Sequence, residues 1–266
     1  MKELEYILFT DETNQQPSLT SKFFIYGGVF IRADRFSELH DTVEAARHDH
    51  GFLPDDGFKF DTHSRPSHVT RENHAAAKKA VLTACDSLAI RFTACLVLHD
   101  IAKNCSLKEL VERGANTVIA AFHRFLEEQN TYGICVMDRL PFKHNFQYLR
   151  EKFHRGLALP GGGIVPLNDR ILLFASSCNG ASHAASAIDI ILGAFRFCVN
   201  ERKRDALPRT ILPIIVRMMW HRHNGGTLHL REYGLLFRPK GVLIDSYKQE
   251  YEELTQHFER LLALSR

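Results

Sequence analysis

The hydrophobic positions of the chain fall into short runs that alternate with longer amphipathic stretches. Residues 5–10 and 23–31 are apolar runs rich in aromatic and β-branched side chains, and the polar residues 14–21 separate them. Such runs, joined by turn-forming residues, predict a hairpin of two strands. The pattern further predicts strands at residues 90–98, 132–137 and 170–174, and helices at residues 34–48, 71–88, 106–129, 145–156 and 182–202. This alternation predicts an α/β protein in which helices pack on a sheet.

Local signals refine this pattern. Asp34 and Ser106 are the expected N-cap residues of their helices, because a short polar side chain there accepts a hydrogen bond from the first turn. Residues 51–68 contain Gly, Pro and Asp and predict a loop with a short strand at its centre. Near the C-terminus the pattern predicts helices at about residues 212–222 and at 246–264. No clean linker interrupts the chain, so we expect one domain, with residues 1–205 as its core and residues 206–266 as a helical extension packed on it.

Composition excludes several classes of protein. Of the 266 residues, 45% are hydrophobic and 24% are charged, which is the balance of a globular protein with a real core. The six cysteines are scattered and include no C-x-x-C pair, which argues against a structural zinc site or a disulfide framework. No apolar run approaches the ~18 residues that a membrane-spanning helix needs. We therefore expect a cytoplasmic protein without a membrane segment.

Asp11 and Asp138 each follow an apolar strand at the position where that strand ends. Ligands of α/β proteins bind at the carboxyl ends of strands, so acids there are candidate ligands for a metal. Each has a structural alternative. Asp11 could be a solvated turn residue, and Asp138 could cap a helix or pair with Arg139.

Asp189 lies inside a predicted helix that is apolar nearly all round, directly between Ile188 and Ile190. A carboxylate in such a place is costly unless it pairs, accepts hydrogen bonds or meets a metal. Small residues one turn away leave space for a close approach, namely Ala185, Ser186 and Gly193. The structural alternative is an ion pair with Arg196 or another cation of the core.

The acids together fit Mg²⁺ or Mn²⁺, because these hard ions take oxygen ligands and keep several waters. Two such ions held ~3.5–4 Å apart can activate a water and stabilise the leaving oxygen of a phosphodiester. A nuclease would act on DNA or RNA, and a C-terminal bias of basic residues could line a groove for that partner. These residues are Arg196, Arg202, Lys203, Arg204, Arg217, Arg222, Arg231, Arg238 and Lys240. They could equally form a solvated face balanced by the acids Glu250, Glu252 and Glu253 of the last helix.

Over most of its length the chain resembles the DUF3800 family of ribonuclease H-like proteins. The motifs that carry the resemblance occur in the family's order: Asp11-Glu12, then Phe24-Ile25-Tyr26-Gly27-Gly28-Val29-Phe30, Gly57-Phe58-Lys59-Phe60, Val136-Met137-Asp138, Ala187-Ile188-Asp189 with Gly193-Ala194, and Leu236-Phe237-Arg238-Pro239-Lys240. The resemblance implies a ribonuclease H-like mixed sheet flanked by helices, with metal-dependent nuclease chemistry. It also implies that Asp11, Asp138 and Asp189 are metal ligands and that Lys59 contacts the phosphate or the charge of the transition state.

One departure from the family pattern affects the expected site. Gly57 stands where the family usually carries a glutamate, and Asp56 or Asp61 could supply the missing carboxylate from a neighbouring position. If neither reaches the metal, the site has lost a ligand. Glu12 is a weaker candidate, because it should point to the opposite face of the strand from Asp11.

Other groups of potentially reactive side chains fit less well. His183 precedes Asp189 by six residues and could act as a proton shuttle, although a capping or core histidine is the simpler interpretation. His221 and His223 are spaced so that a helix would place them on different faces. The best hypothesis is therefore a Mg²⁺- or Mn²⁺-dependent nuclease. The alternatives are a catalytically degenerate module that binds nucleic acid or protein on the same fold, and a small-molecule phosphoesterase.

Overall fold

A computed structural model describes residues 3–18, 21–138, 145–158, 162–178, 180–200, 207–224 and 227–264 of the chain. Its strands are β1 (Leu4–Thr13), β2 (Phe23–Arg32), β3 (Arg91–Leu98), β4 (Tyr132–Asp138), β5 (Leu157–Ala158), β6 (Ile164–Val165), β7 (Ile171–Ser177), β8 (Arg222–Asn224), β9 (Thr227–His229) and β10 (Leu235–Phe237). Its α-helices are α1 (Phe36–Asp49), α2 (Arg71–Ser87), α3 (Leu107–Gln129), α4 (Asn145–Arg155), α5 (His183–Asn200), α6 (Leu207–Met218) and α7 (Asp245–Leu264).

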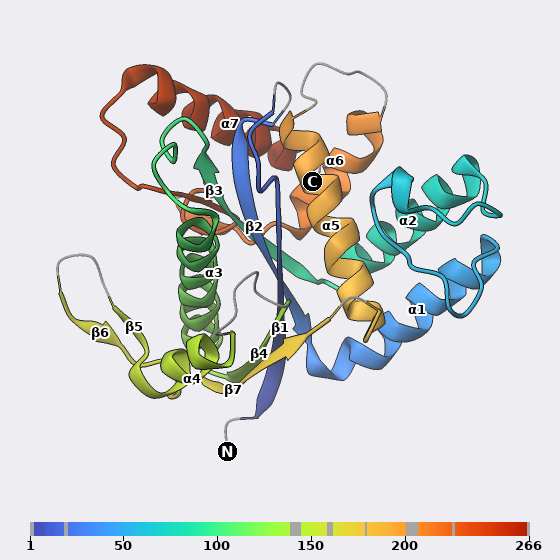
Figure 1. The fold of residues 1–266 in the computed structure, drawn as a ribbon, viewed down its shortest axis with the longest axis horizontal. Helices are drawn as coiled ribbons and strands as arrows, with labels where there is room; N and C mark the ends of the chain where they lie inside the picture. The colour runs from blue at the N-terminus through green and yellow to red at the C-terminus, as the bar shows by residue number, and fades with distance from the viewer. Residues whose placement is uncertain are drawn as a thin grey trace.

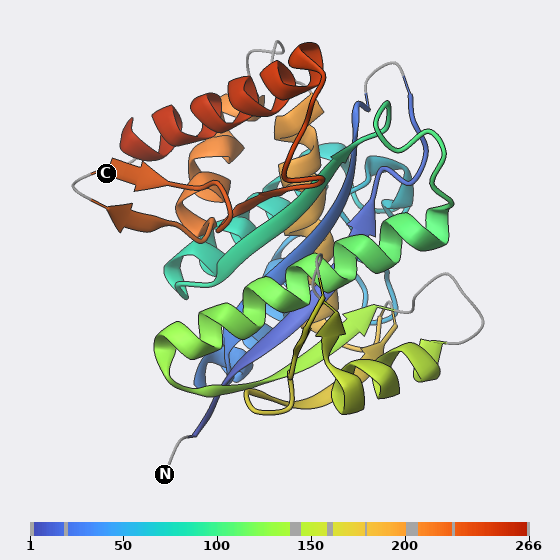
Figure 2. The ribbon, with the colours of Figure 1, turned by 90° about the vertical axis from the view of Figure 1, so that its left-hand side faces the viewer.

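Six of the strands form a central sheet in the order β10-β3-β2-β1-β4-β7. Strands β1, β2 and β3 form an antiparallel meander, whereas β4 and β7 run parallel to β1, and β10 runs parallel to β3. Helices α3 and α4 cover one face of the sheet, and α1, α2, α5 and α6 cover the other (Figures 1 and 2). The predicted fold class, a mixed α/β sheet flanked by helices, is confirmed.

Strand β2 is buried on both faces because helices cover both sides of the sheet. Its side chains alternate between the two hydrophobic clusters, with Phe23 and Ile25 on the α5 face and Phe24 and Tyr26 on the α3 face. This explains why the run is continuously apolar instead of alternating with polar residues. Gly28 gives the sheet its close packing to α3, since a Cβ there would lie 2.4 Å from the side chain of Val118.

Two local predictions have different outcomes. Ser106 accepts a hydrogen bond from the backbone N–H of Glu109, and the Glu109 carboxylate accepts from the backbone N–H of Ser106, so the expected cap of α3 is present as a capping box. The expectation that Asp34 caps the first helix is wrong. Asp34 lies in a short 3-10 helix, Ala33–Arg35, and its carboxylate pairs with Arg32 at 2.7 Å, so that α1 begins only at Phe36.

The chain after residue 206 contains the two helices expected of a helical extension and, in addition, strands that the sequence did not predict. Besides α6 and α7 it contains the hairpin of β8 and β9, and β10 extends the central sheet at the edge of β3. The run Leu235–Phe237 is short and buried, so pairing with β3 satisfies its backbone while its side chains join both clusters. The expected boundary between residues 205 and 206 lies outside the described residues. Among the described residues, none of the helices combines the length and hydrophobicity that a membrane span requires.

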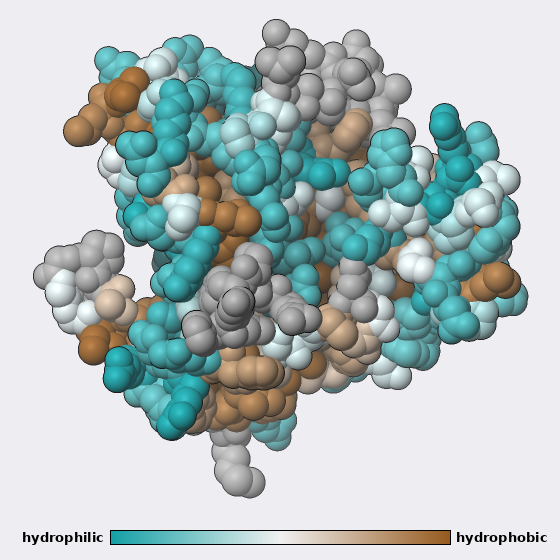
Figure 3. Space-filling model, viewed as in Figure 1, coloured by the Kyte–Doolittle hydropathy of each residue, from teal (hydrophilic) through white to brown (hydrophobic). Residues whose placement is uncertain are grey.

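The surface in Figure 3 is mostly hydrophilic, with apolar side chains gathered low in the view around α4 and β7. Strand β7 is the edge of the sheet, and its residues Leu172 and Leu173 are 47% and 50% exposed. The carboxyl ends of the parallel strands β1, β4 and β7 lie at the same end of the sheet. Asp11 and Asp138 are located at this end.

Candidate functional site

Asp11 and Asp138 occupy neighbouring positions where the pairing between the parallel strands β1 and β4 ends. The last paired residues of β1 and β4 are Thr10 and Met137, and the aspartates are the next residue of each strand. Two residues earlier, Phe9 and Val136 pack in the hydrophobic cluster on the α5 face. Because side chains alternate along a strand, both aspartates are directed toward α5.

Asp189 comes to the same place from α5. Its carboxylate accepts a hydrogen bond of 2.7 Å from the backbone N–H of Phe60, in the loop between α1 and α2. Gly193, one turn later on α5, makes this approach possible, because a Cβ there would lie 2.4 Å from the Phe60 side chain. The small residue noted in the sequence therefore lets the loop approach the helix, and the loop supplies a hydrogen-bond donor to a carboxylate in an apolar helix.

A cavity of about 240 Å³ brings these groups together. Asp11, Asp138 and Asp189 line it, and Lys59 reaches it from the same loop. The other lining residues are Phe9, Thr10, Glu12, Gln15, Ser177, Ala185 and Ile188. Four residues singled out in the sequence thus share one cavity, although they are up to 178 positions apart, from residue 11 to residue 189.

The cavity is strongly unfavourable for negative charge. Burial, together with the charges of Glu12, Asp138 and Asp189, raises the pKa of Asp11 to about 8. Burial and the charge of Asp138 raise the pKa of Glu12 to about 7. The pKa of Asp189 is also raised by burial, although the Phe60 N–H and the charges of Lys59 and Arg196 oppose this shift.

This charge balance fits a divalent cation. The donor set consists of carboxylate oxygens from a strand end, a second strand end and a helix, which is the hard-oxygen chemistry that Mg²⁺ and Mn²⁺ prefer. A cation would also offset the burial and the mutual repulsion that raise the pKa values of Asp11 and Glu12. The chemistry of the donor set therefore fits the metal that the sequence predicts.

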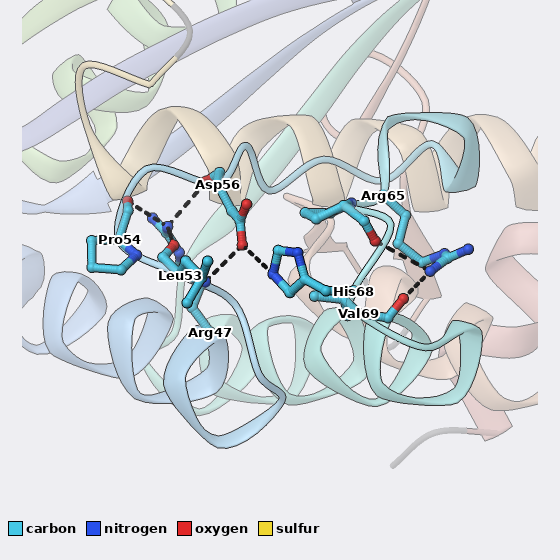
Figure 4. Close-up of polar contacts among 8 residues, drawn as sticks. Arg47, Leu53, Pro54, Asp56, Arg65, His68 and Val69 are labelled. Atoms are coloured by element: carbon cyan, nitrogen blue, oxygen red, sulfur yellow. Dashed lines mark hydrogen bonds and ion pairs between the residues drawn. The ribbon is translucent and has the colours of Figure 1, made fainter.

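Asp56 and Asp61 do not line this cavity. The Asp56 carboxylate accepts a hydrogen bond from the backbone N–H of Leu53 at 2.6 Å and lies 2.9 Å from Nε2 of His68 (Figure 4). Asp61 caps the 3-10 helix Thr62–Ser64 by accepting a hydrogen bond from the backbone N–H of His63 at 2.9 Å. Both carboxylates are thus engaged in holding the loop, and the short strand expected at its centre is absent from this described segment.

The loop also shows why Gly57 matters. Phe58 and Phe60 are buried and Lys59 between them lines the cavity, and this alternation would place a side chain at residue 57 on the same side as that of Lys59. A Cβ added at Gly57 would meet no atom within 4 Å. The position therefore has room for a longer side chain, such as the glutamate expected from the family pattern, and glycine provides no carboxylate there.

Two side chains of α2 hold the backbone of this loop. Nε2 of His74 lies 3.0 Å from the carbonyl oxygen of Lys59 and donates to it, and Nζ of Lys78 donates to the carbonyl oxygen of Phe60 at 2.9 Å. Lys78 also lies over the Phe60 ring, 4.4 Å from its centroid. With the Asp189 bond, three backbone groups of Lys59 and Phe60 are held, which fixes where the Lys59 side chain starts.

Two further residues line the cavity: Glu12, which the sequence made only a weaker candidate, and Gln15, which the sequence did not single out. Strand β1 continues to Thr13 along β2, so Glu12 does alternate away from Asp11 as expected. However, β4 ends at Asp138 and leaves the flank of β1 open, so the cavity reaches both faces of the strand. Gln15 then donates to the Glu12 carboxylate at 3.0 Å. Because β4 ends before β1 does, Glu12 has no neighbouring strand on that side, and this difference in strand length is what would have identified it as a cavity residue.

A second acidic group lies elsewhere, on the α3 face. His123, Glu127 and Asp169 offer side-chain atoms that all lie within 4.8 Å of one another. The buried His123 ring lies between the two carboxylates, with Nε2 2.8 Å from Asp169 and Nδ1 3.4 Å from Glu127. Because both ring nitrogens already have an acidic partner, this group is explained as a tie between α3 and the turn before β7.

The other groups weighed in the sequence are used structurally. Nε2 of His183 pairs with Glu44 of α1 at 2.9 Å, and His183 does not line the cavity. His221 and His223 lie beyond the end of α6, and Nδ1 of His221 is bonded to the carbonyl oxygen of Met219 at 2.8 Å.

Four residues of the C-terminal basic set pair with acids that lie outside the last helix. The pairs are Arg217 with Asp86, Arg222 with Glu128, and both Arg238 and Lys240 with Glu232. Residues 202–204 of that basic set lie outside the described part of the chain.

No family model matches the chain, and no curated protein matches its sequence. Among solved structures, it is similar to a crystal structure of a mutant protein of Bst-RNase HIII, with a TM-score of 0.37 and 9% sequence identity. The alignment covers 81% of this chain and 63% of that chain, so the chain spans less than two thirds of the length of that protein. The geometry of the carboxylate cavity, and not this similarity, is the basis for assigning a function.

Proposed function

We propose that this protein is a divalent-metal-dependent nuclease that hydrolyses phosphodiester bonds of DNA or RNA. The observation that carries the proposal is the convergence of Asp11, Asp138 and Asp189 from three separate elements on one cavity that also contains Lys59. The resemblance to the DUF3800 family, whose members have a ribonuclease H-like fold, supports it through the motifs at these same positions. The free thiols of all six cysteines suit the reducing cytoplasm in which we propose that it acts.

The proposed roles follow from the chemistry of each side chain. Asp11, Asp138 and Asp189 would hold Mg²⁺ or Mn²⁺, which when bound activates a water and stabilises the leaving oxygen of a phosphodiester. Lys59 would contact a phosphate oxygen, where its charge favours the more negative transition state. His74 and Lys78 would keep the backbone of Lys59 in place, so they are positioning residues.

Cleavage assays test the proposal directly. Labelled single- and double-stranded DNA and RNA are incubated with Mg²⁺, Mn²⁺ or EDTA, and wild type is compared with Asp11→Asn and Asp189→Asn. We expect cutting that requires the metal and falls by at least about 100-fold in both variants, since each removes a charged ligand. Cutting that persists unchanged in either folded variant would contradict the assignment.

A catalytically degenerate binding module is the second candidate, and Gly57 is the observation that favours it. Neither Asp56 nor Asp61 replaces the missing carboxylate, because neither lines the cavity. Such a module would retain its nucleic acid or protein partner in EDTA and cut nothing with any metal. Binding measured by fluorescence anisotropy in EDTA, alongside the cleavage assay, separates the two functions.

A further inference from the structure

A second and larger cavity lies on the other face of the sheet. It has a volume of about 540 Å³ and is bounded by α3, the end of β3 with the turn after it, the residues after β10, and β5. Its apolar wall consists of Val97, Ile101, Ala102, Cys105, Ala120, Leu157, Ala158 and Pro239. A mostly apolar cavity of this size with a few polar groups is the usual form of a small-molecule site. Among the residues that the structure describes, none lines both this cavity and the carboxylate cavity.

The charged groups of this cavity are all cationic. They are Arg113, Arg238 and Lys240, and none of its described lining residues is acidic. Arg238 and Lys240 share a single carboxylate, that of Glu232, at 3.0 and 2.8 Å. Glu109, one turn before Arg113, accepts hydrogen bonds from the Ser106 cap at 2.8 and 2.9 Å and keeps its charge near the Arg113 guanidinium, so three cations face two acids, Glu109 and Glu232. The cavity therefore carries excess positive charge and fits a ligand with an anionic group.

Two neighbouring side chains of α3 add a polar edge to the apolar wall. Asn116 accepts a hydrogen bond from the Tyr148 hydroxyl at 2.7 Å through its carbonyl oxygen, which leaves both amide hydrogens for a ligand. The Thr117 hydroxyl donates to the carbonyl oxygen of Arg113 at 2.7 Å and is also a hydrogen-bond partner of the Cys95 thiol, so it is a polar group of the wall that is already partly satisfied. The wall thus offers amide donors next to a hydroxyl, a polar edge that suits the polar edge of a nucleobase.

We propose that this cavity binds a nucleoside monophosphate, either free or as one unit of a nucleic acid strand. The phosphate would lie among Arg113, Arg238 and Lys240, and the base would pack on the apolar wall with its edge at Asn116 and Thr117. The proposal is independent of nuclease activity, because it needs neither the metal nor any residue of the carboxylate cavity.

Ligand binding measured in EDTA tests the proposed nucleotide site. Without metal the acids of the carboxylate cavity repel phosphate, so binding there does not interfere. AMP, CMP, GMP and UMP are titrated by calorimetry against wild type, with inorganic phosphate, adenosine and decanoate as comparison ligands. We expect at least one nucleotide to bind more tightly than about 1 mM and at least tenfold more tightly than each comparison ligand. Nucleotide binding weaker than this, or phosphate or decanoate binding equally well, would overturn the proposal.

Two substitutions at exposed positions of α3 locate the site without endangering the fold. Arg113→Met removes a cation, and Ala120→Trp fills the apolar wall. Each should weaken nucleotide binding by at least about tenfold. Arg113→Met loses a hydrogen bond to the charged phosphate, and Ala120→Trp fills the space that the base would occupy. Lys79→Met, at an exposed lysine of α2, is the matched control and should bind as wild type does. Unchanged affinity in Arg113→Met, or affinity lost in Asp11→Asn, would place the nucleotide elsewhere and overturn the proposal.

An oligonucleotide without terminal phosphates separates the two sources of the ligand. If it binds in EDTA and competes with the mononucleotide, the cavity holds one unit of a strand. If only the mononucleotides bind, the ligand is free nucleotide. Either outcome supports the proposal, and neither depends on whether the protein cuts nucleic acid.

Discussion

The carboxylate of Asp189 and the backbone N–H of Phe60 are joined by a hydrogen bond of 2.7 Å across 129 positions of sequence. This bond ties α5 to the loop that carries Lys59, so the same aspartate that lines the cavity also holds the lysine-bearing segment against it. Charge and hydrogen bonding at Asp189 can therefore be separated by substitution.

Asp189→Asn should keep this bond, because the amide oxygen of asparagine can still accept it, while the negative charge is lost. Asp189→Leu should leave the Phe60 N–H without an acceptor and lower the free energy of unfolding by about 1–3 kcal/mol relative to Asp189→Asn. Urea denaturation in EDTA measures both. Equal stability of the two variants would show that the bond contributes nothing to the fold.

The pKa values in the cavity predict how stability depends on pH without metal. Burial and neighbouring charges raise the pKa of Asp11 in the folded protein to about 8 from its ordinary value of 3.8, and that of Glu12 to about 7 from 4.5. Between pH ~4 and ~8 the unfolded chain has released protons that the folded protein retains, so the free energy of unfolding falls as pH rises. Below this window the stability that comes from keeping these two carboxyls protonated is fully present, and above it that stability is lost.

Urea denaturation in EDTA at pH 5, 6, 7 and 8 measures this slope. Asp11→Asn should reduce it by up to about 1.4 kcal/mol per pH unit, since one titrating proton is removed. Mg²⁺ should stabilise wild type more at pH 8 than at pH 5, because metal competes with protons for the carboxylates. Slopes that are identical in wild type and Asp11→Asn would contradict the raised pKa of Asp11.

Gly57→Glu should strengthen metal binding, because the position is open and lies on the same side of the loop as Lys59. We expect the Mg²⁺ concentration for half-maximal cleavage to fall by about 10-fold, the effect typical of a gained metal-site interaction. Gly241→Glu adds the same charge at another glycine with no atom near its Cβ and serves as the control. If both variants match wild type, the side chain at residue 57 does not reach the metal.

Gly193→Ala reverses the usual effect of this substitution in a helix. Alanine normally stabilises a helix interior over glycine by about 0.5–1 kcal/mol. At Gly193 the added Cβ would lie 2.4 Å from the Phe60 Cβ, so we expect a loss of about 1–3 kcal/mol and weaker activity. Thermal denaturation measures the change in stability, and cleavage rates measure the change in activity. A variant more stable than wild type would show that the loop carrying Phe60 can move away from α5 with little loss of free energy.

Lys78→Met should loosen the Lys59 segment, because it removes the donor to the Phe60 carbonyl and the cation over the Phe60 ring. A loss of about 1–2 kcal/mol in stability and a lower kcat with little change in KM are expected for a positioning residue. Lys78→Arg should partly restore kcat. Lys79→Met, at the exposed neighbour, is the control and should change stability by less than about 0.5 kcal/mol. If Lys78→Met has the same kcat as the control, Lys78 does not position Lys59 for catalysis.

Local chemistry alone determined much of the fold. The apolar runs placed β1, β2, β3, β4 and β7 within a few residues of their observed bounds, and the Ser106 capping box fixed the start of α3, because strand and helix patterns depend on neighbouring residues. Asp11 and Asp138 were recognisable because each ends an apolar strand. Parallel strands then bring such ends together.

Only the tertiary structure decided which groups meet at the cavity. Glu12 faces it because β4 ends before β1, and Asp56 and Asp61 are absent from it because nearby backbone groups hold their carboxylates. His74 and Lys78 reach the loop because α2 packs beside it, and β10 joins the sheet because β3 leaves an open edge. These contacts join residues far apart in sequence, so they depend on how whole elements pack, and no local pattern of side chains encodes that.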